Sequence, residues 1–368
     1  MRRLLYVCAP VDFFVSHRLT LARAAQAAGF DVHVMTPDDG VGVAAIKAAG
    51  LTWHELAIER GGMNPLREAA TVRFFIAAYR RIRPDVVHHV TIKPVLYGTL
   101  AARIVDVPRV VNAVSGLGYM FTGGSALRRR FGALLYRLCL GHRDMTVIVQ
   151  NAEDRDFFVG KRLIDPAAIV LIPGSGVDLA LFEQPPRRTR PMVIQTCRML
   201  ADKGVREFIA AAAMLRPHHD ARFVLVGGPD PANPTSIPVA ELEAAVDAGN
   251  IEWLGQRSDI PDLLATATVY CLASYREGLP KSLIEAAAAS LPLVTTDTSG
   301  CREVVTDGVN GLLVPVADAP ALAAAIGRLL DDEALRDRLG RAARADAEAR
   351  FNVRRIVAAQ VALYGAAA

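Results

Sequence analysis

The sequence has 368 residues, of which 52% are hydrophobic and 22% are charged. That length exceeds one ordinary hydrophobic core and that composition excludes a disordered chain, so we expect two globular domains. No apolar run reaches the roughly 18 residues that a transmembrane helix needs. Asp12 interrupts the apolar start of the chain, which favours a buried strand over a signal peptide.

The net charge of +4 is divided unevenly along the chain. Residues 1–190 hold 25 Lys and Arg against 16 Asp and Glu, whereas residues 191–368 hold 17 against 22. A basic first half indicates an anionic partner, such as a phosphate-bearing substrate or an acidic membrane surface. Nucleic acid is the less favoured partner, because no zinc-finger, helix-turn-helix or RNA-binding motif accompanies the charge.

The five cysteines are far apart in the sequence and form no CxxC pair. Most of them lie inside apolar runs. This pattern predicts reduced, packed thiols in a cytoplasmic protein, and it argues against a disulfide framework or a zinc site.

The first half of the chain alternates short apolar, β-branched runs with helical patterns. Strands are expected at residues 4–9, 31–36, 84–90, 108–114 and 145–151. Helices are expected at residues 17–29, 68–82, 93–105 and 127–141. Such alternation predicts a parallel sheet that is covered by helices on both faces.

The same alternation restarts after a segment rich in proline and charge. Strands are expected at residues 192–197, 222–228, 251–255, 268–273 and 292–297, with helices at 204–215, 239–249, 259–267 and 280–290. Residues 183–191 read as a linker between a first domain, 1–182, and a second domain, 192–349. The last helix, 350–368, is expected to rejoin the first domain. The predicted fold is therefore α/β, with two doubly wound, Rossmann-like domains that face each other across a cleft.

The stretch CRMLADKG places two cations where a strand ends and a helix begins. Arg198 follows the strand, and Lys203 comes just before Gly204 and the helix. A guanidinium and an ammonium beside a helix N-terminus suit a diphosphate group, because charge and helix dipole act together. The alternative is a solvated turn that carries two ordinary surface cations.

The stretch EGLPKSLIE, residues 277–285, carries two glutamates across a strand-to-helix turn. Glu277 lies in the turn, and Pro280 suits the first helical position. The amides of residues 281–283 then form a helix N-terminus that can hold phosphate oxygens. Glu285, one turn further on, is placed to accept the two hydroxyls of a ribose. The alternative is that both glutamates are helix-dipole or surface residues.

These stretches resemble the retaining nucleotide-sugar glycosyltransferases of family four, which have the GT-B fold. EGLPKSLIE matches their E-x7-E signature and CRMLADKG their R-x4-K element. LIPGSGVDLALF, LVGG, WLGQRSDI and DTSGCREVV also match, in the family's order, so the resemblance covers nearly the whole chain. DFFVSHRL, PDVVHHVTIKP and VSGLGYMF are similar to a subgroup that extends glycans carried on undecaprenyl diphosphate.

The resemblance implies roles for individual residues of this chain. Its first domain would bind the acceptor and its second the nucleotide sugar. Arg198 and Lys203 would stabilise the departing diphosphate, Glu277 would contact the donor sugar and Glu285 the ribose. The remaining donor contacts implied are Lys281, Ser282 and Leu283 on phosphate, Gly174 on the donor cleft, and Gln256 with Arg257 near the base. On the acceptor side the expected residues are Asp12, His17 and Lys93.

Two departures from the common family pattern affect this inference. Leu279 and Pro280 replace a Phe-Gly pair in the glutamate turn, and proline removes one amide donor there. Residues 12–14, Asp-Phe-Phe, occupy the turn after the first strand, where many members have two glycines. The first domain's contacts to the donor are therefore left open.

Adjacent histidines close the strand at residues 84–90. In an extended strand His88 and His89 point to opposite faces. One of them is expected in the cleft as a base or acceptor-orienting group, and His89 is the preferred one. The other would be buried and hydrogen-bonded.

Two further patterns have competing interpretations. Residues 154–156 spell DRD, which in other transferases binds a metal, but acids at a helix start complement its dipole. We therefore expect no metal or other cofactor. The helix at 127–141 is basic and amphipathic, which suits either an anionic bilayer or ordinary packing on the sheet. The charge of the first half favours peripheral association with the inner face of the cytoplasmic membrane.

The sequence thus predicts a retaining glycosyltransferase, with an N-acetylhexosamine from a UDP-sugar as the expected donor and a lipid-linked glycan as the acceptor. A sugar-nucleotide epimerase or hydrolase on the same fold is one alternative. A solute-binding protein with two α/β domains is another. A nicotinamide dehydrogenase is disfavoured, because no G-x-G-x-x-G follows the first strand of either domain.

Overall fold

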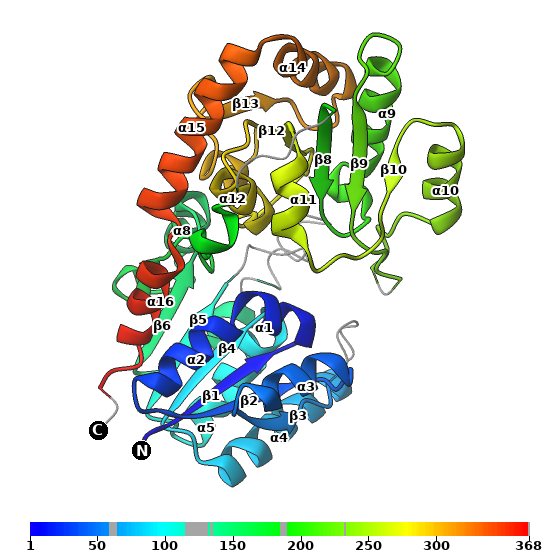
Figure 1. Ribbon diagram of the computed structural model, residues 1–368. Helices are drawn as coiled ribbons and strands as arrows, with labels where there is room; N and C mark the ends of the chain where they lie inside the picture. Colours follow the sequence, from blue (N-terminus) through cyan, green and yellow to red (C-terminus); the bar gives the residue numbers. More distant parts are fainter. Residues whose placement is uncertain (59–64, 115–131, 133–134, 185–189, 232, 367–368) are drawn as a thin grey trace. The chain divides into compact units, whose positions relative to one another are not determined.

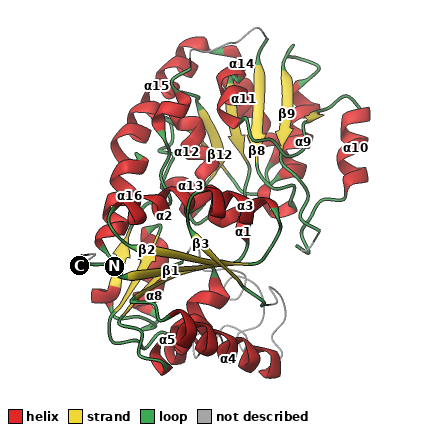
Figure 2. Cartoon of the chain, turned by 60° about the horizontal axis from the view of Figure 1, so that its bottom comes forward, coloured by secondary structure: helices red, strands yellow, loops and turns green. Residues whose placement is uncertain are grey.

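The computed structural model describes residues 1–58, 65–114, 132, 135–184, 190–231 and 233–366. The chain forms two compact units, the first made of Met1–Ser175 with Arg355–Ala368 and the second of Gly176–Arg354. Each unit is a parallel sheet with helices on both faces (Figure 1, Figure 2). The predicted pair of doubly wound α/β domains is therefore confirmed.

The first unit has a seven-stranded parallel sheet in the order β3-β2-β1-β4-β5-β6-β7. Its strands are β1 (Arg3–Cys8), β2 (Asp31–Thr36), β3 (Thr52–Glu55), β4 (Val86–Val90), β5 (Arg109–Ala113), β6 (Met145–Val149) and β7 (Ile169–Leu171). Its described helices are α1 (Val11–His17), α2 (Leu19–Ala27), α3 (Val41–Ala48), α4 (Pro65–Ile82), the π-helix η1 (Pro94–Gly98), α5 (Thr99–Ile104), α8 (Ala152–Gly160) and the 3-10 helix η2 (Pro166–Ala168). The order of the strands reverses between β1 and β4, which is where ligands of such sheets bind.

The two faces of this sheet have separate cores, as the two-sided burial of its strands requires. Tyr6 of β1 packs with Phe14 of α1 and with residues of α2 and α3 on one face. Val7, its neighbour in the strand, packs with Phe75 of α4 and with residues of α5 on the other face. The period of two in the strand therefore sends successive side chains into different cores.

The second unit has a six-stranded parallel sheet in the order β10-β9-β8-β11-β12-β13. Its strands are β8 (Met192–Thr196), β9 (Arg222–Val226), β10 (Glu252–Trp253), β11 (Val269–Leu272), β12 (Leu293–Thr296) and β13 (Gly311–Val314). Its helices are η3 (Leu179–Phe182), η4 (Ala201–Lys203), α9 (Val205–Leu215), α10 (Val239–Asp247), α11 (Ile260–Thr266), α12 (Lys281–Ala288), α13 (Ser299–Arg302), α14 (Ala319–Asp331) and α15 (Glu333–Arg350). Here the strand order reverses between β8 and β11.

The structure differs from the sequence-based expectation in several short elements. The strands β3, β7 and β13 were not expected. Residues 12–14, expected in a turn, form the first turn of α1. His17, expected to open the first helix, is instead the last residue of α1, and α2 begins at Leu19.

The division between the units comes earlier than the predicted end of the first domain at residue 182. Val177 and Phe182 are buried in the core of the second unit, together with Phe351. The amide of Val177 donates to the Phe351 carbonyl at 2.8 Å, which fastens this segment to the end of α15. From Arg355 onward, most of α16 (Val353–Ala362) belongs to the first unit, so the chain returns to it slightly later than the predicted residue 350.

Candidate active site

The predicted donor residues lie in loops that follow neighbouring strands of the second sheet. Arg198 follows β8, Lys203 closes η4, Glu277 follows β11 and Glu285 lies in α12. Because β8 pairs with β11 in parallel, the carboxyl ends of both strands share one edge of the sheet. These side chains therefore lie around the reversal point of the strand order, where an open α/β sheet binds its ligand.

Lys203 and Glu277 form the central contact of this edge. The Lys203 Nζ donates to Glu277 Oε1 at 2.6 Å, and their side chains are only 19% and 13% exposed. Burial by itself lowers the pKa of Lys203, but the Glu277 carboxylate outweighs it and the pKa lies above its ordinary value. Lys203 is thus held as a cation beside a carboxylate, although the two lie 74 residues apart in the sequence.

Arg198 reaches a different carboxylate. Its Nη1 donates to Asp230 Oδ2 at 2.7 Å, and Asp230 lies in the loop after β9. The Arg198 side chain is 56% exposed, so this ion pair contributes little stability and leaves the guanidinium accessible to an anion. Asp230 itself is fixed by its amide, which donates to Ser236 Oγ at 3.1 Å.

The segment that carries Arg198 and Lys203 packs closely against the end of β11. Gly204 has a φ of +67°, and a Cβ there would lie 2.0 Å from the Ala273 carbonyl oxygen, so only glycine fits against the end of β11. Buried Gln195 donates from Nε2 to the Lys203 carbonyl at 3.0 Å and accepts from the Ala273 amide at 3.4 Å. The position of Lys203 is therefore fixed by backbone contacts between two strand ends.

The helix α12 begins beside this cluster. Pro280 is its N-cap and not its first helical residue, so α12 begins one residue later than expected. Pro280 makes no side-chain capping hydrogen bond. Lys281 Nζ lies 3.3 Å from Glu285 Oε1, one helical turn away. Burial raises the pKa of Glu285, although Lys281 opposes the effect. The Leu283 amide donates to the Pro280 carbonyl at 3.2 Å, so the phosphate contact expected of that amide is already occupied within the helix.

Two further predicted donor residues lie at the edge of the same sheet. Gln256 and Arg257 are exposed in the loop after β10. Arg257 donates to both oxygens of the Asp259 carboxylate, at 2.8 and 2.6 Å. This loop follows β10, so at the sheet edge the end of β9 lies between it and the end of β8, which Lys203 follows.

His89 is not a solvent-facing base, and this expectation is wrong. Its side chain is fully buried in the first unit, where Nε2 pairs with Tyr79 Oη at 2.8 Å and Nδ1 with Asn112 Oδ1 at 2.8 Å. Burial lowers the pKa of His89 to about 3. His88 points to the opposite face, as predicted, and its Nδ1 pairs with Tyr364 Oη at 2.7 Å. Both rings are neutral structural groups.

The predicted acceptor residues of the first unit follow the adjacent strands β1 and β4, whereas Gly174 follows β7 at the edge of the sheet. Asp12 is exposed in α1 after β1, and His17 ends that helix, stacked on Phe13 at 4.1 Å. Lys93 follows β4, and β1 pairs with β4 in parallel. Gly174 has a φ of +70°, and its carbonyl accepts from buried Gln360 at 3.4 Å.

Three contacts around the predicted donor residues were missed by the sequence analysis. Asp230, the partner of Arg198, follows the Gly-Gly pair after β9 and was identifiable as an acid at a strand end. Gln195 is a polar residue inside an apolar strand, which is a signal for a specific hydrogen-bonding role. Tyr270 of β11 pairs with Thr196 Oγ1 at 2.9 Å, beneath the first turn of α12, and no pattern in the sequence reveals it.

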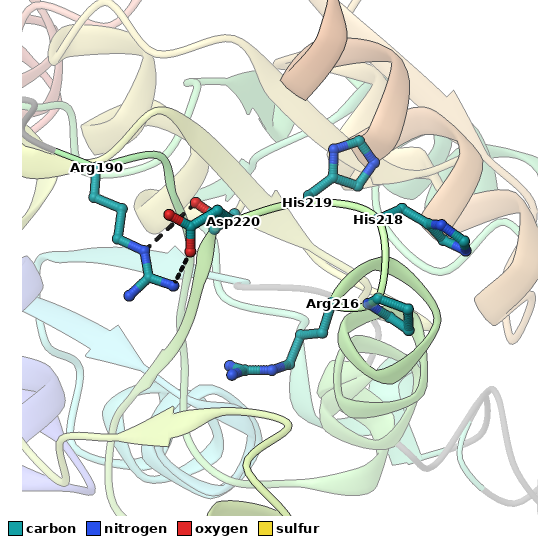
Figure 3. A pocket seen from close by; sticks show the side chains of 7 residues that line it. Arg190, Arg216, His218, His219 and Asp220 are labelled. Carbon is teal, nitrogen blue, oxygen red and sulfur yellow. Dashed lines mark hydrogen bonds and ion pairs between the residues drawn. The ribbon is translucent and has the colours of Figure 1, made fainter.

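A polar hollow of about 310 Å³ lies on another part of the second unit (Figure 3). It is lined by Arg190, Arg216, His218, His219 and Asp220, with Arg190 paired to Asp220. These residues precede β8 and β9, so the hollow is at the amino ends of the strands. It is separate from the edge that carries Lys203, and His218 and His219 lie in the loop between α9 and β9.

Comparison with known proteins places the chain in a family. The description "Glycosyl transferases group 1" matches residues 190–332, and "Glycosyl transferase 4-like" matches residues 3–151. The N,N'-diacetylbacillosaminyl-diphospho-undecaprenol alpha-1,3-N-acetylgalactosaminyltransferase of Campylobacter jejuni is 30% identical over 349 residues, which is 90% of each chain. The chain belongs to this family of glycosyltransferases.

Further relatives of this glycosyltransferase agree with that placement. An Escherichia coli UDP-Gal:alpha-D-GlcNAc-diphosphoundecaprenol alpha-1,3-galactosyltransferase is 25% identical over 288 residues, covering 72% of each chain. The Anabaena protein HepE, solved with UDP and glucose, superimposes with a TM-score of 0.80 at 19% identity over 98% of each chain. The latter likeness establishes the shared fold.

The expectations about a membrane-spanning helix and about a metal site can be compared with the described residues only. Among them, no helix is long and apolar enough to cross a membrane, and no group of His, Cys, Asp and Glu side chains is arranged to hold a metal ion. In the DRD stretch, Asp154 is buried and its amide donates to Asn151 Oδ1 at 2.7 Å. Residues 127–131, 133 and 134 of the basic helix expected at 127–141 lie outside the described residues.

Proposed function

We propose that this glycosyltransferase moves a sugar from a nucleotide diphosphate donor to a hydroxyl of a lipid-linked glycan, with retention of the anomeric configuration. The observation that carries the proposal is the Lys203–Glu277 pair with Arg198 nearby, at the carboxyl ends of β8 and β11. Two cations, a helix start and a carboxylate at one sheet edge are what a diphosphate-linked sugar requires.

In this proposal Arg198 and Lys203 bind the diphosphate, assisted by the N-terminus of α12. Glu285 accepts the ribose hydroxyls, and Glu277 orients the donor sugar through its hydroxyls. Gln256 and Arg257 contact the base. The Lys203 ammonium, held as a cation by Glu277, is present before the donor arrives, so no charge has to be created during the reaction.

The reaction then proceeds by attack of the acceptor on the face from which the diphosphate leaves. The bond between the anomeric carbon and the β-phosphate oxygen breaks, and a bond from that carbon to the acceptor oxygen forms. The acceptor's proton goes to the departing phosphate oxygen. Arg198 and Lys203 stabilise the negative charge that grows on the diphosphate, so the proposal requires no metal ion.

The expected donor is UDP carrying an N-acetylhexosamine, and the expected acceptor is a glycan on a polyprenyl diphosphate. The names of the Campylobacter and Escherichia coli relatives support this class of acceptor, and HepE supports a uridine nucleotide. Asp12, His17 and Lys93 of the first unit are the proposed acceptor contacts. Such a lipid substrate also supports peripheral association with the inner face of the cytoplasmic membrane.

The proposal is tested in two steps with the full chain. A thermal-shift screen of nucleotide sugars should give its largest stabilisation with UDP-N-acetylhexosamines. Transfer from the best donor to an N-acetylhexosaminyl-diphospho-polyprenol should then give a product with the donor's anomeric configuration by NMR. Inversion of that configuration would overturn the retaining mechanism. Release of free sugar, or of an epimerised nucleotide sugar, with no transfer to any acceptor would favour a hydrolase or epimerase instead.

A further inference from the structure

The residue after β4 has a strained backbone at the ligand-binding edge of the first sheet. Thr91 has a φ of +74°, which is unusual for a β-branched side chain and costs free energy that its surroundings must offset. Its hydroxyl oxygen is buried and has no hydrogen-bond partner among the described residues. The strand order reverses beside this position, between β1 and β4.

The segment that follows Thr91 is held rigidly against the sheet. Residues Pro94–Gly98 form the π-helix η1. This conformation is rare in proteins overall, and where it occurs it is often near a functional site. At Gly98 a Cβ would lie 2.5 Å from His89 Nε2 and 2.8 Å from Tyr79 Oη, so glycine is required for this close approach. The buried His89–Tyr79 pair therefore supports η1 from below, which is the role the structure gives to His89.

An ion pair that is mostly buried lies beside the start of this segment. Lys93 Nζ donates to Glu68 Oε1 of α4 at 2.8 Å, with side chains 15% and 14% exposed. The second carboxylate oxygen, Glu68 Oε2, is buried and has no partner among the described residues. Burial and the neighbouring Glu68 carboxylate raise the pKa of Tyr97, which remains a neutral hydroxyl.

We propose that Thr91, Glu68, Lys93 and Tyr97 form a subsite for the terminal sugar of the acceptor. This inference rests on the proposed function and names the residues that would recognise its acceptor. Two unpaired buried oxygens, from a hydroxyl and a carboxylate, lie at the edge where a parallel sheet binds its ligand. Each of them is satisfied by an O–H or N–H donor on the ligand.

The charges of the cluster favour a neutral polyol over a phosphate. Lys93 is already compensated by Glu68 at 2.8 Å, so the pair has no net positive charge to offer an anion. A sugar ring supplies several hydroxyls that both donate and accept, and an N-acetyl group adds one N–H donor.

The first experiment compares Thr91→Gly with Thr91→Ser in the full chain. Glycine relieves the backbone strain and removes the hydroxyl, whereas serine keeps the hydroxyl. We expect Thr91→Gly to raise KM for an N-acetylhexosaminyl-diphospho-polyprenol about fivefold, with the melting temperature unchanged or higher, and Thr91→Ser to stay within twofold of wild type. Asp106→Gly, an exposed positive-φ position before β5, is the control for strain relief alone.

The second experiment replaces the unpaired carboxylate. Glu68→Gln should raise acceptor KM by about tenfold or more, because a hydrogen bond to a charged group is lost. Donor KM, UDP binding and acceptor-independent hydrolysis of the donor should not change. Asp144→Asn, which disrupts the 2.8 Å ion pair with Arg109 before β6, is the matched control and should affect none of these quantities.

The outcomes separate this inference from the proposed function. If wild type transfers sugar and Glu68→Gln and Thr91→Gly leave acceptor KM unchanged, the subsite is wrong and the proposed function stands. If both variants weaken donor hydrolysis as much as transfer, the cluster has only a structural role. If wild type transfers no sugar from any UDP-sugar to the diphospholipid acceptors, the proposed function itself fails.

Discussion

The two units share one architecture but differ in where their polar side chains lie and how these are paired. In the second unit, charged side chains are paired at loop ends, as with Arg198–Asp230 and Lys203–Glu277. In the first unit, titratable side chains such as His88 and His89 are buried within the strands as neutral groups. The same sheet topology therefore carries ion pairs at the strand ends in the second unit and buried neutral histidines within a strand in the first.

The largest expected effect is on the charged site of the second unit. Lys203→Ala should lower the transfer rate about 10³-fold, because a cation positioned at the departing diphosphate is lost and Glu277 is left without its partner. Arg206→Ala is the control, since Arg206 pairs with Glu241 on the surface at 2.6 Å. Transfer kinetics with UDP-N-acetylhexosamine measure both variants, and a loss below tenfold for Lys203→Ala would contradict the role.

Acidification should destabilise the first unit at a higher pH than the second. Burial lowers the pKa of His88 and His89, so their contribution to stability is present above the ordinary value of about 6.5 and is lost as the pH falls towards the folded-state values. Hydrogen bonds from Arg206 and Arg222 lower the pKa of Glu241 and Glu252 in the second unit. The stability that these pairs contribute is therefore lost only when the pH falls below about 4.5.

Hydrogen exchange of the full chain at pH 7, 5.5 and 4 measures this difference. Each buried histidine that must be protonated costs about 1.4 kcal/mol per pH unit in this window. Peptides of β1, β4 and α5 should therefore lose protection at a higher pH than peptides of β8 and β11. Equal loss in both units, or earlier loss in the second, would show that the buried histidines do not control acid stability.

Arg18 is a charged side chain that the first unit buries. Its side chain is 2% exposed, its Nε has no hydrogen-bond partner, and no carboxylate pairs with it among the described residues. Burial lowers the pKa of Arg18, which marks an unfavourable environment for its charge. Arg18→Met should therefore raise the free energy of unfolding by about 1–3 kcal/mol, measured by urea denaturation. A destabilisation of similar size would show that the guanidinium has a structural partner.

The smallest expected effect concerns Glu285 in the second unit. Burial raises its pKa, so the carboxylate that would accept the ribose hydroxyls is lost on acidification at a higher pH than for an exposed glutamate. UDP affinity should fall as the pH drops towards 5, and Glu285→Gln should bind UDP about tenfold more weakly at pH 7 but with little pH dependence. Calorimetric titration measures both, and an unchanged pH profile in Glu285→Gln would exclude Glu285 as the titrating group.

The sequence predicts the second unit better than the first. The donor residues lie in two short motifs that each join a strand end to a helix start, so their mutual placement follows from the parallel pairing of β8 and β11. Asp230 escapes prediction because its contact with Arg198 depends on the fold of the loop after β9. Local motifs therefore identify both cations and Glu277, but not the Asp230 carboxylate that holds Arg198.

In the first unit, the chemistry depends on burial, which alternation in a strand does not reveal. The sequence indicates that His88 and His89 face opposite sides of the sheet, and this is confirmed. It does not indicate that both sides are buried, by α16 and Tyr364 on one face and by α4 and Tyr79 on the other. Glu68 was likewise invisible as a site residue, because its proximity to Lys93 depends on how α4 packs beside β4 and η1.

The central claim is that the edge carrying Arg198 and Glu277 binds and activates a nucleotide diphosphate sugar. The most direct measurement is the rate of labelled N-acetylhexosamine transfer from UDP-sugar to a diphospholipid acceptor by wild type and by the double variant Arg198→Ala, Glu277→Ala. We predict that the double variant, verified as folded by circular dichroism because it removes the partner of buried Lys203, loses transfer by more than 10³-fold. A folded double variant with the wild-type transfer rate would contradict the account.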